Sequence, residues 1–195
     1  MAIINYPIKK SSEHQKNVNF KNRGMSLEED INLTNEYYLL NEIAVIHKKP
    51  TPIQVVDVYY PARNKAVIKE AYYKTPSTTD YNGIYRGKYI DFECKESNSK
   101  TSFPLANIHP HQLKHLDMIC KCGGIGFFII LFKQFNEIFF VEYNLIKPFY
   151  EKTYTRKSIP YSFFKENCPL IDYNYKIRID YLKVIREKYF EENNT

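Results

Sequence analysis

Three ionisable side chains share one face of a strand that the sequence predicts between Tyr89 and Lys95. Side chains alternate between the two faces of a β-strand, so Asp91, Glu93 and Lys95 point the same way. The intervening side chains point toward a core: Ile90, Phe92 and Cys94. The pattern therefore predicts a strand with one buried face and one charged face.

A further carboxylate, Asp80, is predicted to lie beside Glu93 because a hairpin turn between them in the sequence brings their two segments together. Asn82-Gly83 is a strong short hairpin signal. A turn at Asn82-Gly83 folds the segment that carries Asp80 back against the strand that carries Glu93. We therefore expect two carboxylates and the ammonium of Lys95 to meet in one small volume.

This set of groups suits metal-assisted cleavage of a phosphodiester. Carboxylate oxygens at Asp80 and Glu93 are the hard ligands that Mg²⁺ or Mn²⁺ prefers. A metal there could bind the phosphodiester and lower the pKa of an attacking water, while Lys95 stabilises the transition state. The Asp-(x)n-Glu-x-Lys pattern is typical of a large class of metal-dependent nucleases. A half-exposed strand with a solvated charged face explains the same residues, and the pattern alone does not decide between them.

Size and composition are those of one domain with appendages. The chain has 195 residues, 28 Lys and Arg against 22 Asp and Glu, and a formal net charge of +6. This charge is compatible with a polyanionic partner. The first 22 residues lack an apolar signal segment, and the longest apolar run, 124–132, is too short to cross a bilayer. We expect a cytoplasmic protein with no membrane partner, whose four cysteines are reduced structural thiols.

The N-terminal part divides at about residue 22. Residues 1–22 are polar with little apolar periodicity, which predicts a disordered basic arm. Residues 23–195 are predicted to form a single domain. Ser26-Leu27-Glu28-Glu29 is a capping box that predicts a helix running to about Ile43. The arm is either an inert tail or a DNA contact, in which case Arg23 lies close enough to the domain to take part.

A long hairpin with a basic tip is predicted over about 53–74. Two β-rich runs, Ile53–Tyr60 and Ala66–Tyr73, flank Pro61–Lys65. Lysines on such a hairpin can simply keep an edge strand soluble. Basic residues interleaved with tyrosines also suit binding of distorted or unpaired nucleic acid. The candidate DNA contacts of this region are Lys48, Lys49, Arg63, Lys65, Lys69 and Lys74.

The C-terminal half supplies further elements. A helix is predicted from Pro110 to Gly123, with the amide oxygen of Gln112 on its inner edge, able to reach a metal or a water. Strands are predicted at Gly126–Phe132 and Glu137–Tyr143, and a last helix after Asp180. Three histidines lie at the start of the helix predicted from Pro110: His109, His111 and His115. We interpret them as surface residues or phosphate contacts, because no cysteine or carboxylate completes a zinc site with them.

With these residues placed, the chain resembles the RecU-type Holliday junction resolvases. The resemblance covers nearly all of residues 22–190. It is carried by five stretches: Asn22–Leu39, Ile43–Gln54, Val67–Lys74, Ser77–Glu96 and Lys100–Gln112. Together these stretches are far more specific than the nuclease pattern alone. The pair of cysteines in Cys120-Lys121-Cys122 departs from what the family leads us to expect.

The resemblance implies a restriction-endonuclease-like α/β fold, in which helices flank a mixed β-sheet and a β-hairpin stalk protrudes. It implies a homodimer that resolves four-way DNA junctions by paired symmetric nicks, with Mg²⁺ as the cofactor and Mn²⁺ able to substitute. It also implies roles in recombination, DNA repair and chromosome segregation, and modulation of the RecA recombinase, with Arg63 matching a recombinase contact. The motif match assigns metal binding to Thr78, Asp80, Glu93 and Gln112, and transition-state stabilisation to Lys95.

Two other functions fit parts of the sequence. A junction-binding or strand-annealing protein could keep the fold without cleavage, but the intact Asp80, Glu93 and Lys95 argue against it. A sequence-specific restriction enzyme would share the dimer and the metal, but would gain nothing from a basic stalk. Incubating a four-way junction and a linear duplex with and without Mg²⁺ distinguishes all three.

Overall fold

The centre of the molecule is a mixed five-stranded sheet. The computed structural model describes residues 26–62, 64–74, 78–151 and 156–191. The strands follow the order β1-β4-β5-β7-β8, with β5 and β7 parallel and the other neighbours antiparallel. Their bounds are β1 Val45–Lys48, β4 Tyr81–Tyr85, β5 Lys88–Ser97, β7 Ile125–Phe132 and β8 Glu137–Glu142.

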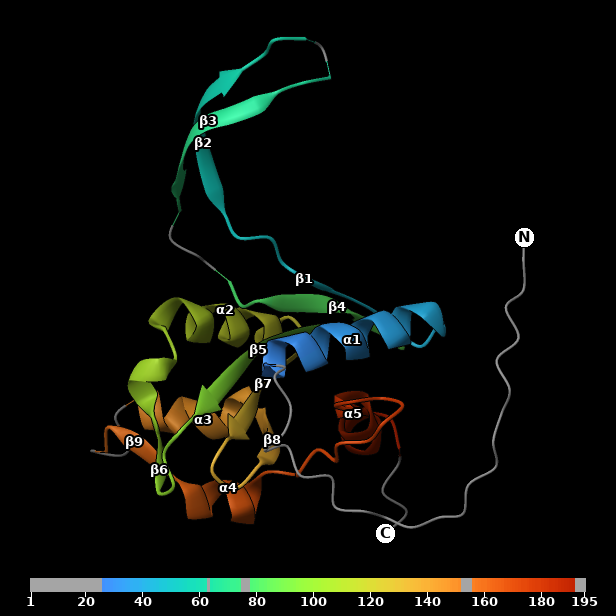
Figure 1. The fold of residues 1–195 in the computed structure, drawn as a ribbon. Helices are drawn as coiled ribbons and strands as arrows, with labels where there is room; N and C mark the ends of the chain where they lie inside the picture. The colour runs from blue at the N-terminus through green and yellow to red at the C-terminus, as the bar shows by residue number, and fades with distance from the viewer. Residues whose placement is uncertain (1–25, 63, 75–77, 152–155, 192–195) are drawn as a thin grey trace.

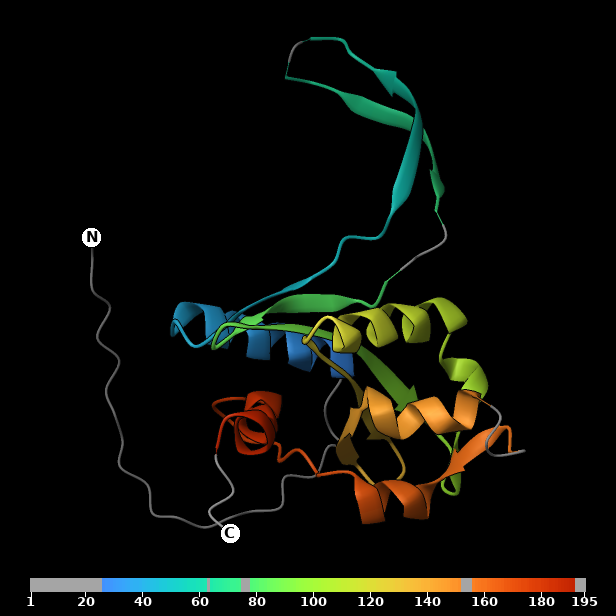
Figure 2. The same cartoon turned by 180° about the vertical axis from the view of Figure 1, so that it is seen from behind.

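Helices cover both faces of this sheet (Figures 1 and 2). Phe127 and Ile129 of β7 pack in a core with α1 and α5, whereas Phe128 and Ile130 pack with α2, α3 and α4. Because alternate residues of one strand enter different clusters, the clusters lie on opposite faces. The helices are α1 Leu27–Leu40, α2 Pro110–Lys121, α3 Tyr143–Tyr150, α4 Tyr161–Asn167 and α5 Tyr181–Tyr189. The predicted mixed sheet flanked by helices is confirmed.

The N-terminal helix begins where the capping box predicted. The Ser26 hydroxyl accepts a hydrogen bond from the N–H of Glu29 over 3.2 Å, and the Glu29 carboxylate accepts one from the N–H of Ser26 over 2.6 Å. Ile31 and Tyr38 are buried on the inner face of α1. The helix ends at Leu40, three residues before the predicted end.

The stalk is a separate two-stranded sheet inserted between β1 and β4. Strands β2 (Ile53–Tyr59) and β3 (Val67–Tyr73) pair antiparallel and stand away from the body (Figure 1). Every described residue of this hairpin is exposed except Val58, which is half-buried. The predicted protruding hairpin is confirmed. Its tip residue Arg63 lies outside the described residues.

The predicted turn at Asn82-Gly83 is wrong. Both residues lie inside β4, and the chain reverses at Arg86-Gly87, where φ is 47° and 76°. Two successive positive φ values are what a tight two-residue hairpin requires. Gly83 serves another purpose, because a Cβ there would lie 2.0 Å from the carbonyl oxygen of Val45. The glycine lets the edge strand β1 approach β4 closely.

The segment after β5 crosses over to bring β7 parallel to it. It contains the short strand β6 (Ser102–Pro104), a 3₁₀ turn (Leu105–Asn107) and α2, which begins at Pro110 as predicted and is followed by Gly123 at φ 86°. Strand β9 (Ser158–Pro160) pairs with β6. Within the described part of the chain, no helix is long and apolar enough to cross a membrane.

Candidate active site

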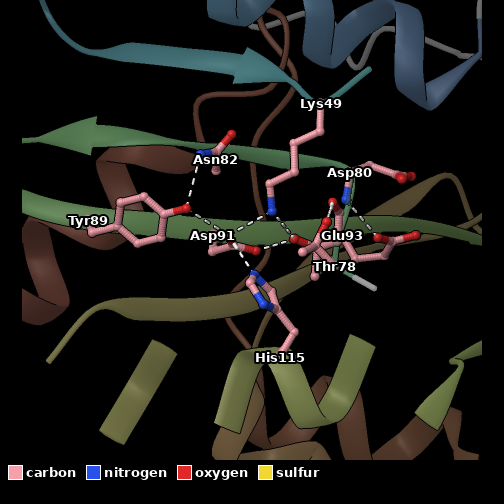
Figure 3. Close-up of polar contacts among 9 residues, drawn as sticks. Lys49, Thr78, Asp80, Asn82, Tyr89, Asp91, Glu93 and His115 are labelled. Atoms are coloured by element: carbon pink, nitrogen blue, oxygen red, sulfur yellow. Dashed lines mark hydrogen bonds and ion pairs between the residues drawn. The ribbon is translucent and has the colours of Figure 1, made fainter. Parts of the chain in front are cut away.

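Asp80 and Glu93 face each other across two antiparallel strands. Tyr81 pairs with Phe92. Asp80 precedes Tyr81 and Glu93 follows Phe92, so these two residues lie opposite each other just past that pair. The backbone N–H of Asp80 donates to Oε2 of Glu93 over 3.0 Å (Figure 3). The predicted approach of the two acidic residues is therefore found, although a turn at Arg86-Gly87 produces it.

Glu93 is a buried carboxylate with perturbed protonation. The residue is 2% exposed, and the ammonium of Lys95 lies 2.9 Å from its Oε1. Burial raises the pKa of Glu93 to about 7. The ammonium of Lys95 lowers this pKa and offsets burial only in part, while the charge of Asp80 raises it further. Two adjacent carboxylates that repel one another suit a bound cation. The donor set of Asp80 and Glu93 therefore fits a divalent metal with oxygen ligands.

The other two predicted metal ligands make hydrogen bonds of their own. Thr78 is half-buried and its hydroxyl donates to the carbonyl of Thr79 over 3.2 Å. Gln112 is buried in the first turn of α2, where its Oε1 accepts from the N–H of His109 over 3.0 Å. Among the described residues, no group of three or more His, Cys, Asp or Glu side chains is arranged to hold a metal. Ligation by Thr78 and Gln112 stays a prediction.

A second carboxylate on the same face of β5, Asp91, is wholly buried at 0% exposure. Its Oδ2 lies 2.8 Å from Nζ of Lys49, 3.0 Å from Nε2 of His115 and 3.1 Å from the hydroxyl of Tyr89. The hydroxyl of Thr79 donates to its other oxygen. Figure 3 shows Lys49, Tyr89 and His115 pointing toward Asp91. Strand alternation predicted Asp91 on this face, but no pattern in the sequence indicated its partners.

The residues predicted to contact DNA differ in their exposure and in their partners. Lys48 pairs with Glu28 on the surface, whereas Lys49 turns inward to Asp91. On the stalk, Nζ of Lys69 lies 4.7 Å from the centre of the Tyr59 ring, and Lys65 and Lys74 are exposed. Arg23 and Arg63 lie outside the described residues. Contact of these residues with DNA stays a prediction.

Comparison with known proteins identifies the family. The family described as "RecU: Recombination protein U" matches residues 22–187. The chain belongs to the RecU family. One RecU relative from Oceanobacillus iheyensis, named Holliday junction resolvase RecU, is 51% identical over 91% of this chain and 92% of its own length. A relative of the same name from a Geobacillus strain is 53% identical over 88% of this chain and 87% of its own.

A RecU relative from Bacillus thuringiensis carries the same name and is 51% identical over 94% of this chain and 90% of its own. Among solved structures, the chain is similar to Hjc of Archaeoglobus fulgidus, described as a Holliday junction resolvase from an archaeal hyperthermophile. That likeness has a TM-score of 0.38 and 11% identity, and covers 71% of this chain and 90% of that chain. The RecU family resemblance read from the sequence is confirmed.

Proposed function

We propose that this protein is a structure-selective endonuclease that resolves Holliday junctions, as the names of its relatives at 51% and 53% identity state for those proteins. The observation that carries the proposal is the meeting of Asp80 with the Glu93–Lys95 ion pair. Family membership supports the substrate class, and this cluster supports the cleavage chemistry.

The cofactor is Mg²⁺, with Mn²⁺ able to substitute. Asp80 and Glu93 would hold it, helped by oxygen atoms of Thr78 and Gln112. The chemistry expected of the bound ion is Lewis acidity toward the phosphodiester and a lowered pKa for the attacking water. Because Gln112 now caps α2 through Oε1, its ligation requires either a second contact to the same oxygen or a small rotation.

The protein side chains have separable roles. Glu93 must lose its proton before it can bind a cation, and a pKa of about 7 places that loss near neutral pH. Lys95 favours the ionised form of Glu93 and offers an ammonium to the charge that develops on the phosphate. Asp80 is more exposed than Glu93 and so lies on the side from which a phosphodiester can approach.

Junction selectivity belongs to the stalk and to a homodimer. Paired symmetric nicks in opposing strands of a four-way junction require two sites, which a dimer supplies. The exposed lysines and tyrosines of β2 and β3 suit the open centre of a junction. The remaining parts of the proposal are a cytoplasmic role in recombination, repair and chromosome segregation, and modulation of RecA.

One cleavage assay tests the proposal. An end-labelled four-way junction and a linear duplex with the sequence of one arm are incubated with the protein, with and without Mg²⁺. We expect paired nicks in opposing strands of the junction, in Mg²⁺ only, and an intact duplex. A junction that is bound but never cut would point to a silent junction-binding protein, and equal cleavage of the duplex would remove the junction selectivity.

A further inference from the structure

The segment that carries Asp80 lies beyond the paired positions of the sheet. The last pair of the β1–β4 ladder is Lys48 with Tyr81, and the last pair of the β4–β5 ladder is Tyr81 with Phe92. Asp80 therefore lies one residue beyond both ladders, where the chain returns from the stalk. The backbone at Asp80 must therefore be held by contacts beyond the two ladders.

Those contacts come from Lys49 and Thr79. The backbone N–H of Lys49 donates to the carbonyl of Asp80 over 2.7 Å. The ammonium of the same lysine donates to Oγ1 of Thr79 over 3.1 Å and to Asp91 over 2.8 Å. Lys49 thus contacts the segment through both its backbone and its side chain.

Lys49 and Thr79 both donate hydrogen bonds to the carboxylate of Asp91. Its carboxylate is wholly buried on the central strand β5 and accepts from Lys49 on one oxygen and from Thr79 on the other. A buried carboxylate is strongly unfavourable unless it is paired and hydrogen-bonded, and Asp91 has a cation and several donors. Both carboxylate oxygens of Asp91 therefore have hydrogen-bond partners.

We infer that Asp91 is a positioning residue of the proposed nuclease site, which acts through Lys49 and Thr79 to hold Asp80 against Glu93. The inference rests on the proposed function. In this role Asp91 does not itself bind the substrate or the metal. Glu93 lies two residues after Asp91 on the same face of β5 and accepts a hydrogen bond from the N–H of Asp80. Asp91 and Glu93 therefore hold the Asp80 segment from neighbouring positions on one strand.

A matched pair of substitutions at Thr79 tests the inference with little disturbance of packing. Thr79→Val keeps the shape of this 2%-exposed side chain and removes the hydroxyl, whereas Thr79→Ser keeps the hydroxyl. Asp91→Asn removes the negative charge of the carboxylate. Lys48→Met serves as a control, because Lys48 pairs with Glu28 outside the network.

The first measurement uses neither metal nor DNA. Amide hydrogen exchange is followed residue by residue in the four variants and the wild type. We expect Thr79→Val and Asp91→Asn to lose protection at the amides of Lys49 and Asp80, while amides of the central strand β7 keep it. Thr79→Ser and Lys48→Met should keep wild-type protection throughout.

The second measurement is calorimetric titration with MnCl₂ in the absence of DNA. Loss of a residue that orients a metal ligand typically weakens affinity by about 10- to 100-fold, and we expect that loss for Thr79→Val and Asp91→Asn. Thr79→Ser should restore wild-type affinity. A network that only stabilises the fold would lower the melting temperature without separating the valine from the serine variant in Mn²⁺ affinity.

Wild-type exchange at Lys49 and Asp80 in both Thr79→Val and Asp91→Asn would overturn the inference. This outcome is distinct from failure of the proposed function. If the wild type left four-way junctions uncut in Mg²⁺, the function would be wrong, but the exchange measurement would still decide whether Asp91 holds the Asp80 segment.

Discussion

The backbone N–H of Asp80 donates to Oε2 of Glu93, while the other oxygen of Glu93 receives the ammonium of Lys95. Both oxygens of this buried carboxylate are thus oriented by groups of the protein itself. Preorganised groups need not be reoriented during the reaction. The three residues that the sequence singled out for cleavage therefore lie in one connected arrangement.

Protonation of Glu93 should appear as a dependence of stability on pH. The pKa of Glu93 rises from 4.5 to about 7 in the folded protein. Because the pKa is higher in the folded state, the stabilisation that protonated Glu93 contributes to the free energy of unfolding is fully present below pH 4.5. This stabilisation is lost as the pH rises through 7. Glu93→Gln cannot ionise, so its melting temperature without metal should exceed that of the wild type increasingly between pH 5 and 8.

Thermal melts of both proteins in chelator at several pH values check this expectation. About 1 kcal/mol corresponds to a shift of roughly 2–4 °C for a chain of this size, so a difference is measurable. Adding Mg²⁺ at pH 8 should stabilise the wild type and leave Glu93→Gln unchanged. A pH-independent difference between the two would mean that Glu93 is already ionised well below neutrality.

Lys95→Ala should slow cleavage and move its pH dependence. Removing one electrostatic stabiliser of developing charge typically lowers the rate by about 10² to 10³. Because Lys95 lowers the pKa of Glu93, its loss should also shift the pH midpoint of cleavage upward at limiting Mg²⁺. Single-turnover rates measured from pH 6 to 9 test both effects. A rate loss below about tenfold, with no shift, would make Lys95 a bystander.

Replacing Pro61–Lys65 with a short Gly-Ser turn should weaken junction binding far more than duplex binding. The replaced segment carries the basic residues Arg63 and Lys65, which are expected to enter the open centre of a junction. There they would support nearby Tyr59 and Tyr72, which can stack on exposed bases, each worth roughly 1–3 kcal/mol. The body should stay folded because β4 and β5 close through Arg86-Gly87 and not through the stalk. Titrations of both substrates at one salt concentration, with circular dichroism, give the answer. Equal losses would reduce the stalk to a general basic patch.

Much of the fold follows from local patterns. The capping box at Ser26 predicted the start of α1, and the alternation of Asp91, Phe92 and Glu93 assigned the apolar and the charged face of β5. The charged face is buried as well, because Asp91 and Glu93 are 0% and 2% exposed. The stalk was visible as two β-rich runs around a basic tip. These features depend on neighbours within a few residues, which is the range over which a sequence is directly informative.

What the sequence could not provide depends on long-range packing. Asn82-Gly83 is an ordinary turn signal, but the approach of β1 makes it a strand position at which only a glycine fits. The helices α3 and α4 have only 8 and 7 residues, and Pro148 lies inside α3, so neither is long enough to stand out as a helix in the sequence. Three partners of Asp91 lie far from it in the sequence: Thr79 by 12 residues, His115 by 24 and Lys49 by 42. A local sequence pattern cannot predict contacts over such separations.

The central claim is that Asp80 and Glu93 form the cutting centre while the rest of the protein binds the junction. Asp80→Asn and Glu93→Gln each remove one charge with little change of shape. Mobility-shift titration and cleavage of one labelled four-way junction in Mg²⁺ are measured together for both variants and the wild type. We predict wild-type or tighter binding and no cleavage by either variant, because phosphate contacts elsewhere carry affinity. Cleavage near the wild-type rate by either variant would contradict the account.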